Sequence, residues 1–187
     1  SLNLTYNFSE KSLLRLAYGK TLNRPEFREL APFSFYDFVN NRTVSGNPTL
    51  QNADIQNFDF RYEFYPTPTE LISVAAFYKD FTNPIEVVFA SGANPILNFS
   101  NAKSAYSTGI EAELRKNLSP EKPNSILGKT SLVFNGTYIF SRVKLDDAVA
   151  NDQSDNRPLQ GQSPYIVNAG LNYNDTQKGL QVNFNYN

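Results

Sequence analysis

Two carboxylates on one side of an extended segment are the first residues in this sequence whose types and spacing could do chemistry. Glu111 and Glu113 are separated by one residue, so in a strand both side chains point the same way. Such a pair serves acid–base catalysis when a nucleophile and a shaped pocket lie beside it. Arg115 follows on the same side, and the chain holds no nucleophile motif or phosphate-binding loop. The three charges therefore favour an ionic ladder, and we expect no enzyme activity.

Metal and imidazole chemistry is restricted by composition. The 187 residues contain no His and no Cys, which excludes imidazole catalysis, disulfides and thiolate metal sites within them. The acidic segment from Asp146 to Asp155 could offer carboxylate oxygens to calcium, but its Asp152-x-Ser154-x-Asn156 order lacks the turn glycine and the terminal Glu of an EF-hand loop. A solvated acidic loop is the prediction, and no metal or cofactor is expected.

Arginine and aromatic residues gather in a stretch without periodicity between residues 24 and 54. Guanidinium groups bind anions, and aromatic rings stack on planar or cationic groups. The candidates for ligand contact are Arg24, Arg28, Phe35, Tyr36 and Arg42. The same residue types also form the interfacial girdle of membrane proteins, where Arg binds lipopolysaccharide phosphates or pairs with Asp and Glu. We expect ligand recognition in this loop, with the interfacial role as the alternative.

Strands with a period of two residues are predicted to position these groups. In residues 57–64 four aromatics alternate with four polar or charged residues, so one face is aromatic and the other is charged. Other segments alternate in the same manner. The eight predicted strands are residues 2–8, 12–23, 57–64, 71–81, 106–118, 130–143, 164–173 and 180–186. One residue, Phe77, breaks the pattern because it falls on the less apolar face.

The connections between these strands alternate between short and long. Short turns join the strands in pairs, and long loops cover residues 24–54, 82–102 and 144–163. In the second of these loops, the apolar residues 85–89 could continue a strand beyond the membrane. Outer-membrane barrels have short periplasmic turns and longer extracellular loops, and a water-filled lumen suits strand faces that carry charges. The predicted fold class is all-β, an antiparallel up-and-down transmembrane β-barrel with about eight strands present. A soluble β-sandwich is the alternative.

Net charge and hydropathy argue against a nucleic-acid partner and against a transmembrane helix. The 17 basic and 18 acidic residues leave a formal net charge of −1, so we expect no nucleic-acid partner. No run of 18 apolar residues occurs, which excludes a transmembrane helix, while the mean hydropathy of −0.45 is compatible with strands apolar on one face. The chain has no Met, so we expect a fragment or a processed product.

Several short stretches resemble one protein family. They are NRPEFRELAPF at 23–33, GNPTL at 46–50, FYKDFTNPIE at 77–86, GIEAEL at 109–114 and LQGQSPY at 159–165. In this order they resemble TonB-dependent receptors of the type common in Bacteroidetes. The resemblance implies a 22-stranded barrel that is filled by an N-terminal plug and imports scarce ligands with energy from the TonB complex of the inner membrane.

Residues 1–187 are accordingly expected to be a single partial β-barrel domain, without plug, TonB box and remaining strands, in the outer membrane of a Gram-negative bacterium. The expected partners are outer-membrane lipid or lipopolysaccharide, an imported small solute (siderophore, vitamin, glycan or similar), and the TonB complex through N-terminal parts outside this chain. The alternatives are a small outer-membrane barrel acting as anchor or adhesin, and a soluble all-β binding module. Because part of a barrel has two open edges, we expect the isolated chain to oligomerise or to close differently.

Overall fold

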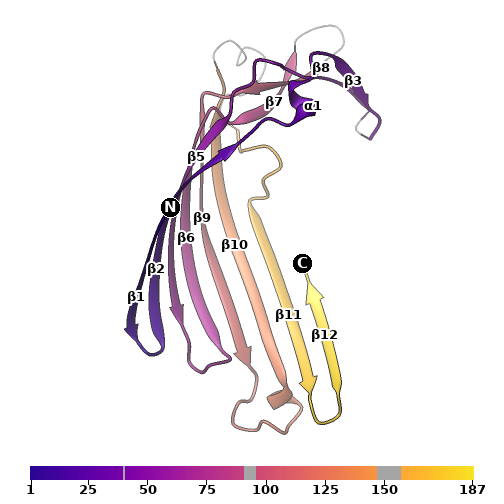
Figure 1. Cartoon of the computed structure of the whole chain (residues 1–187). Coiled ribbons are helices and arrows are strands. Elements are labelled where there is room, and N and C mark those ends of the chain that lie inside the picture. Colours follow the sequence, from indigo (N-terminus) through magenta and orange to yellow (C-terminus); the bar gives the residue numbers. More distant parts are fainter. Residues whose placement is uncertain (40, 91–95, 147–156) are drawn as a thin grey trace.

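Eight long strands form one antiparallel sheet (Figure 1). The computed structural model describes residues 1–39, 41–90, 96–146 and 157–187. In sheet order the strands are β1 (Leu2–Ser9), β2 (Ser12–Asn23), β5 (Ala53–Phe64), β6 (Leu71–Thr82), β9 (Ser104–Asn117), β10 (Thr130–Lys144), β11 (Tyr165–Asp175) and β12 (Leu180–Tyr186). Each strand pairs with the next along the chain within this set, so the sheet is an up-and-down meander. The eight predicted strands are confirmed, with ends that differ by a few residues.

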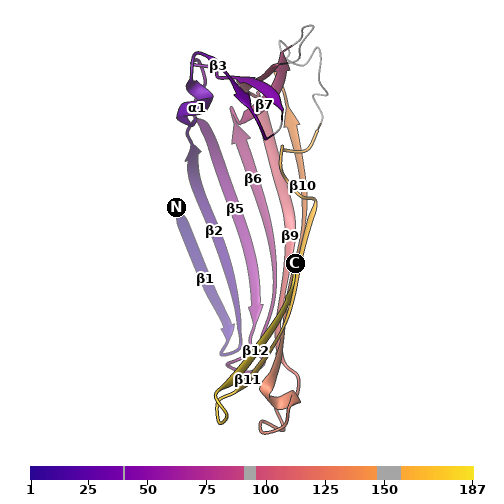
Figure 2. The ribbon, with the colours of Figure 1, turned by 90° about the vertical axis from the view of Figure 1, so that its right-hand side faces the viewer.

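The sheet is curved and open. Figures 1 and 2 show β1 and β12 at opposite edges, and no described pairing joins them, so the barrel is not closed. The short turns lie together at one end, which includes the 3₁₀ turn η1 (Leu127–Lys129), and the long loops lie together at the other. This arrangement follows from the alternation of connection lengths, because antiparallel neighbours reverse direction at each connection.

The two faces of the sheet differ in chemistry, because successive side chains of a strand point to opposite sides. One row across the sheet joins Leu16, Phe60, Ala76 and Ile110, and the adjacent row on the other face joins Arg15, Arg61, Ala75 and Glu111. We call these the apolar face and the polar face. Exposed side chains of the apolar face include Leu4, Tyr6, Leu16, Phe58, Phe60, Tyr62, Val74, Tyr78, Ile110, Tyr138, Phe140, Val167, Leu171, Val182 and Phe184. A contiguous uncovered apolar surface of this kind marks an interaction with lipid or with another protein.

The long loops carry more structure than the one strand segment indicated at residues 85–89. A second sheet has the order β3 (Ser34–Asp37), β4 (Arg42–Ser45), β8 (Ile96–Asn101) and β7 (Ile85–Ala90), and its β4–β8 pairing is parallel. The short helix α1 (Phe27–Leu30) precedes this sheet. Its N-terminus is capped by a capping box between Glu26 and Glu29. Among the described residues no helix is long and apolar enough to cross a membrane. We call this second sheet the loop sheet. The acidic segment that was considered for calcium lies mostly outside the described residues.

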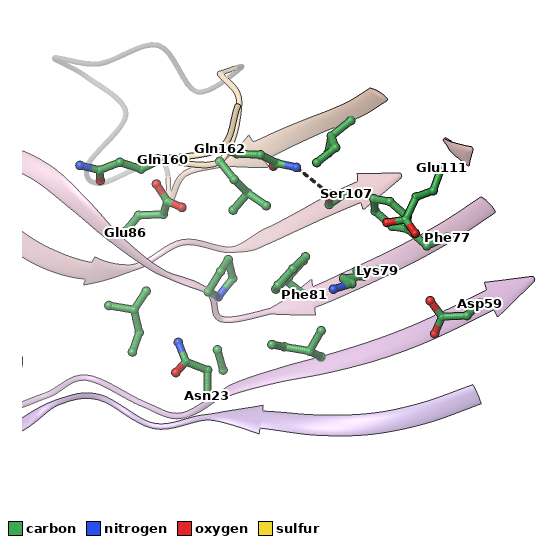
Figure 3. Close-up of a pocket in the computed structure, with 17 residues that line it drawn as sticks. Asn23, Asp59, Phe77, Lys79, Phe81, Glu86, Ser107, Glu111, Gln160 and Gln162 are labelled. Carbon is green, nitrogen blue, oxygen red and sulfur yellow. Dashed lines mark hydrogen bonds between the residues drawn. The ribbon is translucent and has the colours of Figure 1, made fainter. Parts of the chain in front are cut away.

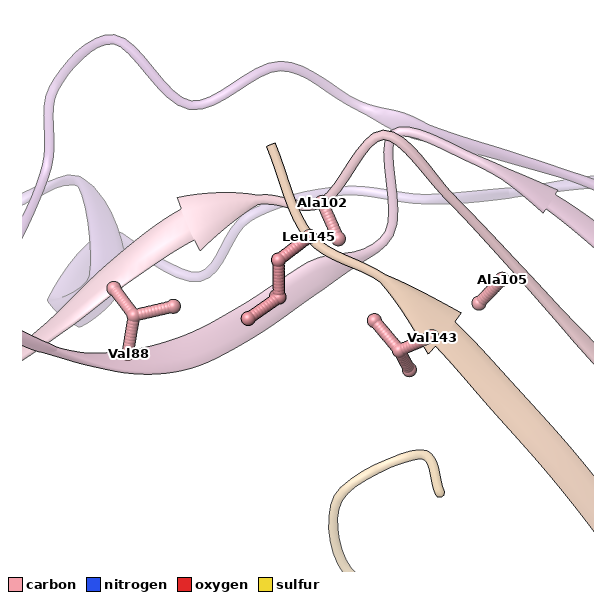
Figure 4. Close-up of a cluster of buried hydrophobic side chains, with 5 residues drawn as sticks. All are labelled: Val88, Ala102, Ala105, Val143 and Leu145. Carbon is pink, nitrogen blue, oxygen red and sulfur yellow. The ribbon is translucent and has the colours of Figure 1, made fainter. Parts of the chain in front are cut away.

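The hydrophobic core sits where the loop sheet meets the ends of the long strands (Figure 4). Its buried members are Val88, Ala102, Ala105, Val143 and Leu145, with Phe81 and Leu159 packed against them. These residues come from the second and third long connections and from the strands beside them. The loop end is therefore packed as one unit, while the middle of the long sheet leaves its apolar face uncovered.

Candidate functional site

A pocket lies on the polar face directly beneath the loops. It encloses about 580 Å³ and is lined by β5, β6 and β9 on one side and by the loop segments around Glu86 and Gln162 on the other. The strands contribute Asp59, Lys79 and Glu111, which all lie on the polar face because of the register. Figure 3 shows Asp59 and Glu111 at one end of the pocket and Glu86 at the other.

Glu86 is the buried charge of this pocket. Its residue is only 4% exposed, and its Oε2 lies 2.8 Å from Nη2 of Arg157 in an ion pair. Burial raises the pKa of the Glu86 carboxyl above its ordinary value, although the Arg157 guanidinium opposes the shift. Within the described residues Oε2 of Glu86 has no hydrogen bond of good geometry. The site thus holds a carboxylate that retains capacity to accept a proton or a hydrogen bond.

A strap from the third long loop closes the pocket from above. The backbone N–H of Val143 donates to the carbonyl of Arg157 at 2.9 Å, and the N–H of Leu159 donates to Oγ of Ser141 at 3.0 Å. Nε2 of Gln162 then donates to Oγ of Ser107 at 3.1 Å, as drawn in Figure 3. The amide oxygen of Gln162 is buried without a hydrogen-bond partner in the described part of the chain. The strap therefore adds a buried acceptor that has no hydrogen-bond partner among the described residues.

The floor of the pocket is aromatic. Phe77 is directly opposite Gly109 in the β6–β9 pairing, and a Cβ on Gly109 would lie 2.6 Å from two atoms of the Phe77 ring. The ring therefore occupies the space that a side chain at position 109 would fill. Nζ of Lys79 is 5.7 Å from the centroid of the same ring, within cation–π range. The exception to the alternation at Phe77 thus marks a pocket residue.

The predicted ligand residues of the first long loop come together only in part. The guanidinium of Arg28 in α1 lies over the ring of Phe35 in β3, 5.5 Å from its centroid. Arg28, Phe35 and Tyr36 line a shallow hollow of about 880 Å³ on the outer loops. The Tyr36 hydroxyl donates to the side-chain oxygen of Asn41. Arg24 and Arg42 do not line this hollow.

The predicted ionic ladder forms nearer the turns and is larger than expected. Nη2 of Arg115 lies 2.9 Å from Glu113, which also accepts from Arg61 at 2.7 Å. Arg61 and Arg15 both pair with Glu63, at 2.9 and 3.1 Å. Arg61 reaches Glu113 across β6 because the β6 residues in these rows, Ser73 and Ala75, are small. Glu111 makes no described ion pair and lines the pocket instead.

The fold and its two faces define a class of protein, an open segment of a transmembrane-type β-barrel with structured loops. The chain belongs to the family described as "TonB dependent receptor-like, beta-barrel", whose sequence model matches residues 1–187. No curated protein sequence matches. The family and the solved neighbours are transport receptors rather than enzymes.

Several solved structures share this fold. The siderophore receptor PirA from Acinetobacter baumannii superposes with a TM-score of 0.65 at 18% identity over 98% of this chain and 27% of its own. The ferric enterobactin receptor PfeA from Pseudomonas aeruginosa, mutant R480A with enterobactin, gives 0.63 at 19% identity over 91% and 25%. The copper transporter OprC gives 0.63 at 15% identity over 91% and 23%. The chain spans about a quarter of the length of these proteins.

Proposed function

We propose that this chain is part of the barrel wall of an outer-membrane receptor in a Gram-negative bacterium, and that the receptor imports a scarce small solute such as a siderophore, a vitamin or a glycan. The observation that carries the proposal is the division of one sheet into an uncovered apolar face and a charged polar face with a pocket. Lipid covers the apolar face, and the polar face lines the lumen.

An aromatic belt supports the membrane placement. On the apolar face, ring centroids follow one another at 4.9 Å from Tyr18 to Phe58, 6.4 Å to Tyr78, 6.3 Å to Tyr106 and 6.1 Å to Phe140. These rings come from five neighbouring strands, β2, β5, β6, β9 and β10. Aromatic girdles of barrels lie at the level of the lipid headgroups. We assign the belt to the outer interface, which makes outer-membrane lipid or lipopolysaccharide a partner of this face.

The remaining parts of the receptor belong to the same proposal. Residues 1–187 form a single partial barrel domain, and the plug, the TonB box and the other strands lie elsewhere in the receptor. Contact with the TonB complex passes through those N-terminal parts. The stretches at 23–33 and 159–165 support a receptor of the Bacteroidetes type.

The outer hollow is proposed to contribute to ligand capture. Its stacked Arg28 and Phe35, with Tyr36, offer a cationic and aromatic surface at the loop end. Arg24 and Arg42 lie on the same long connection, outside the hollow. Their positive charges attract any anionic group of an approaching solute toward it.

The test of this function is solute uptake by cells that carry the full-length receptor. We expect the receptor in the outer-membrane fraction and growth on its solute only when TonB is present. A receptor with residues 28–38 replaced by a Gly/Ser linker should reach the membrane and lose capture. Equal growth with and without TonB, or recovery of the receptor in the soluble fraction, contradicts the proposal.

A further inference from the structure

We propose that the pocket beneath the loops binds an uncharged, hydroxyl-rich solute of the saccharide class, an assignment that rests on the proposed import function and specifies its substrate. The pocket contains a built set of acceptors, an aromatic floor and a single cation. The carboxylates disfavour an anion, Lys79 opposes a polycation, and the aromatic floor can pack on C–H groups.

Hydrogen-bond acceptors outnumber donors around the pocket. Three carboxylates line it, from Asp59, Glu86 and Glu111, and Lys79 is the one cation among its described lining residues. The buried Oε1 of Gln162 has no hydrogen-bond partner in the described ranges, and the buried Oε2 of Glu86 has only its ion-pair contact with Arg157. Buried acceptors without partners cost free energy, so a ligand that supplies hydroxyl donors is stabilised there.

The charges make a neutral solute the best match. An anion would approach three carboxylates, and among the described residues only Glu86 of the three is paired with an arginine, Arg157. A polycation would meet Lys79, whose ammonium group lies over the Phe77 ring. A hydroxyl group both donates and accepts, so a saccharide can use the carboxylates and Lys79 together.

The apolar part of the pocket fits the same class. The rings of Phe77 and Phe81 line it beside the polar groups. A sugar ring has a face of C–H groups that packs on an aromatic ring while its hydroxyls point to the sides. A volume of about 580 Å³ lies inside the range of small-molecule sites, roughly 300–1,000 Å³.

The experiment measures binding of defined probes to the full-length receptor in detergent by titration calorimetry. The neutral probes are maltotriose, cellotriose and raffinose, the cation is spermine and the anion is ferric enterobactin. We compare the wild type with Asp59→Asn/Glu111→Gln, which keeps the shape of two lining side chains and removes their charge. The matched control is Glu10→Gln/Glu121→Gln, which changes the charge equally in two exposed turns at the far end.

We expect at least one neutral trisaccharide to bind, with roughly tenfold weaker binding in the pocket variant, because hydrogen bonds to charged groups are the strong ones. The control should bind as the wild type does. Binding of spermine or ferric enterobactin without any trisaccharide, or no trisaccharide binding at all, overturns the saccharide assignment. TonB-dependent growth on a ferric siderophore would then leave the import function standing, whereas growth independent of TonB would remove both.

Discussion

Gly109 and Phe77 form a pair in which the absence of one side chain makes room for another. A Cβ at position 109 would lie 2.6 Å from the Phe77 ring and 2.6 Å from the carbonyl oxygen of Tyr138. We therefore expect Gly109→Ala to destabilise the folded chain by about 1–3 kcal/mol through overpacking. The free energy of unfolding in urea, measured for refolded protein in detergent, checks this value.

Gly19→Ala is the matched control, because the nearest atom to an added Cβ there is 3.9 Å away. Gly109→Ala combined with Phe77→Ala should regain part of the loss, since the ring clash is removed while the Tyr138 carbonyl remains. Equal unfolding free energies for Gly109→Ala and the wild type would show that the ring does not lie over Gly109.

Glu86 gives the molecule a pH dependence of opposite sign to that of an exposed ion pair. Its pKa in the folded state is raised by burial, so its contribution to stability is fully present below the ordinary Glu value of about 4.3 and is lost as the pH rises through the raised value. We expect the unfolding free energy of the wild type, minus that of Glu86→Gln, to fall as the pH increases across this window. A flat or rising difference between the two proteins argues against a raised pKa.

The contacts of a site residue could be predicted from the sequence where its partner lies only a few residues away along the chain. Arg28 and Phe35 are seven residues apart, and their contact lies inside one loop that the sequence had marked for ligand binding. Glu86 and Gln162 were missed because the Arg157–Glu86 ion pair and the hydrogen bonds of the strap bring segments together that are far apart in the sequence. The usable signal was Phe77, an aromatic on a polar face across from a glycine.

Among elements, the long strands were predictable because period 2 operates within each strand. Of the loop sheet only β7 was indicated, by the apolar residues 85–89, since its strands are short and are stabilised by pairing between connections. Val44 of β4, for example, pairs with Leu97 of β8 in the parallel direction. Such long-range pairing leaves no periodic trace, whereas a 12-residue strand such as β2 repeats its pattern several times.

Replacing each of two adjacent alanines in β6 by arginine, one at a time, tests the environment of the two faces of the sheet. Ala76 belongs to the exposed apolar row, and Ala75 lies on the polar face directly opposite Glu111. We expect Ala76→Arg to cost about 2–4 kcal/mol in lipid, as for a cation near the midplane of a barrel's outer surface. Ala75→Arg should cost less than Ala76→Arg, because water and Glu111 lie on its face; the cost that remains comes from the guanidinium that it places opposite Arg61, in the path of the Arg61–Glu113 ion pair. Unfolding in lipid vesicles measures both.

The unfolding costs of these two variants in vesicles show which face of the sheet lipid covers. Equal costs in vesicles would mean that lipid does not cover the apolar face, and a larger cost at Ala75 would reverse the assignment of the faces. In detergent-free buffer we expect no defined order of the two unfolding costs, because no lipid or detergent then covers the apolar face of the wild type.

At the scale of the whole molecule, the stability of the two ends has different origins. The loop end carries the buried cluster of Val88, Val143 and Leu145 and closes the pocket, whereas the long sheet depends on its ladder and on what covers its apolar face. A soluble β-sandwich would have covered that face with a second sheet, but the loop sheet packs at the strand ends instead. The open edges and the uncovered face are therefore properties of one piece of wall.

Both edge strands of the long sheet lack an outer neighbour in the described part of the chain. β1 and β12 each have one neighbour in the described sheet, so each presents a row of unpaired backbone N–H and C=O groups. We expect the isolated chain, refolded in detergent, to show β-type circular dichroism and to form oligomers whose light-scattering mass rises with protein concentration. The full-length receptor is the control: the proposed function expects other strands to pair with both edges there, so it should stay monomeric at the same concentrations. A concentration-independent monomer of the isolated chain with full β signal would mean that the two edges meet each other, as in a small closed barrel, and would favour the anchor or adhesin alternative over a segment of a larger wall.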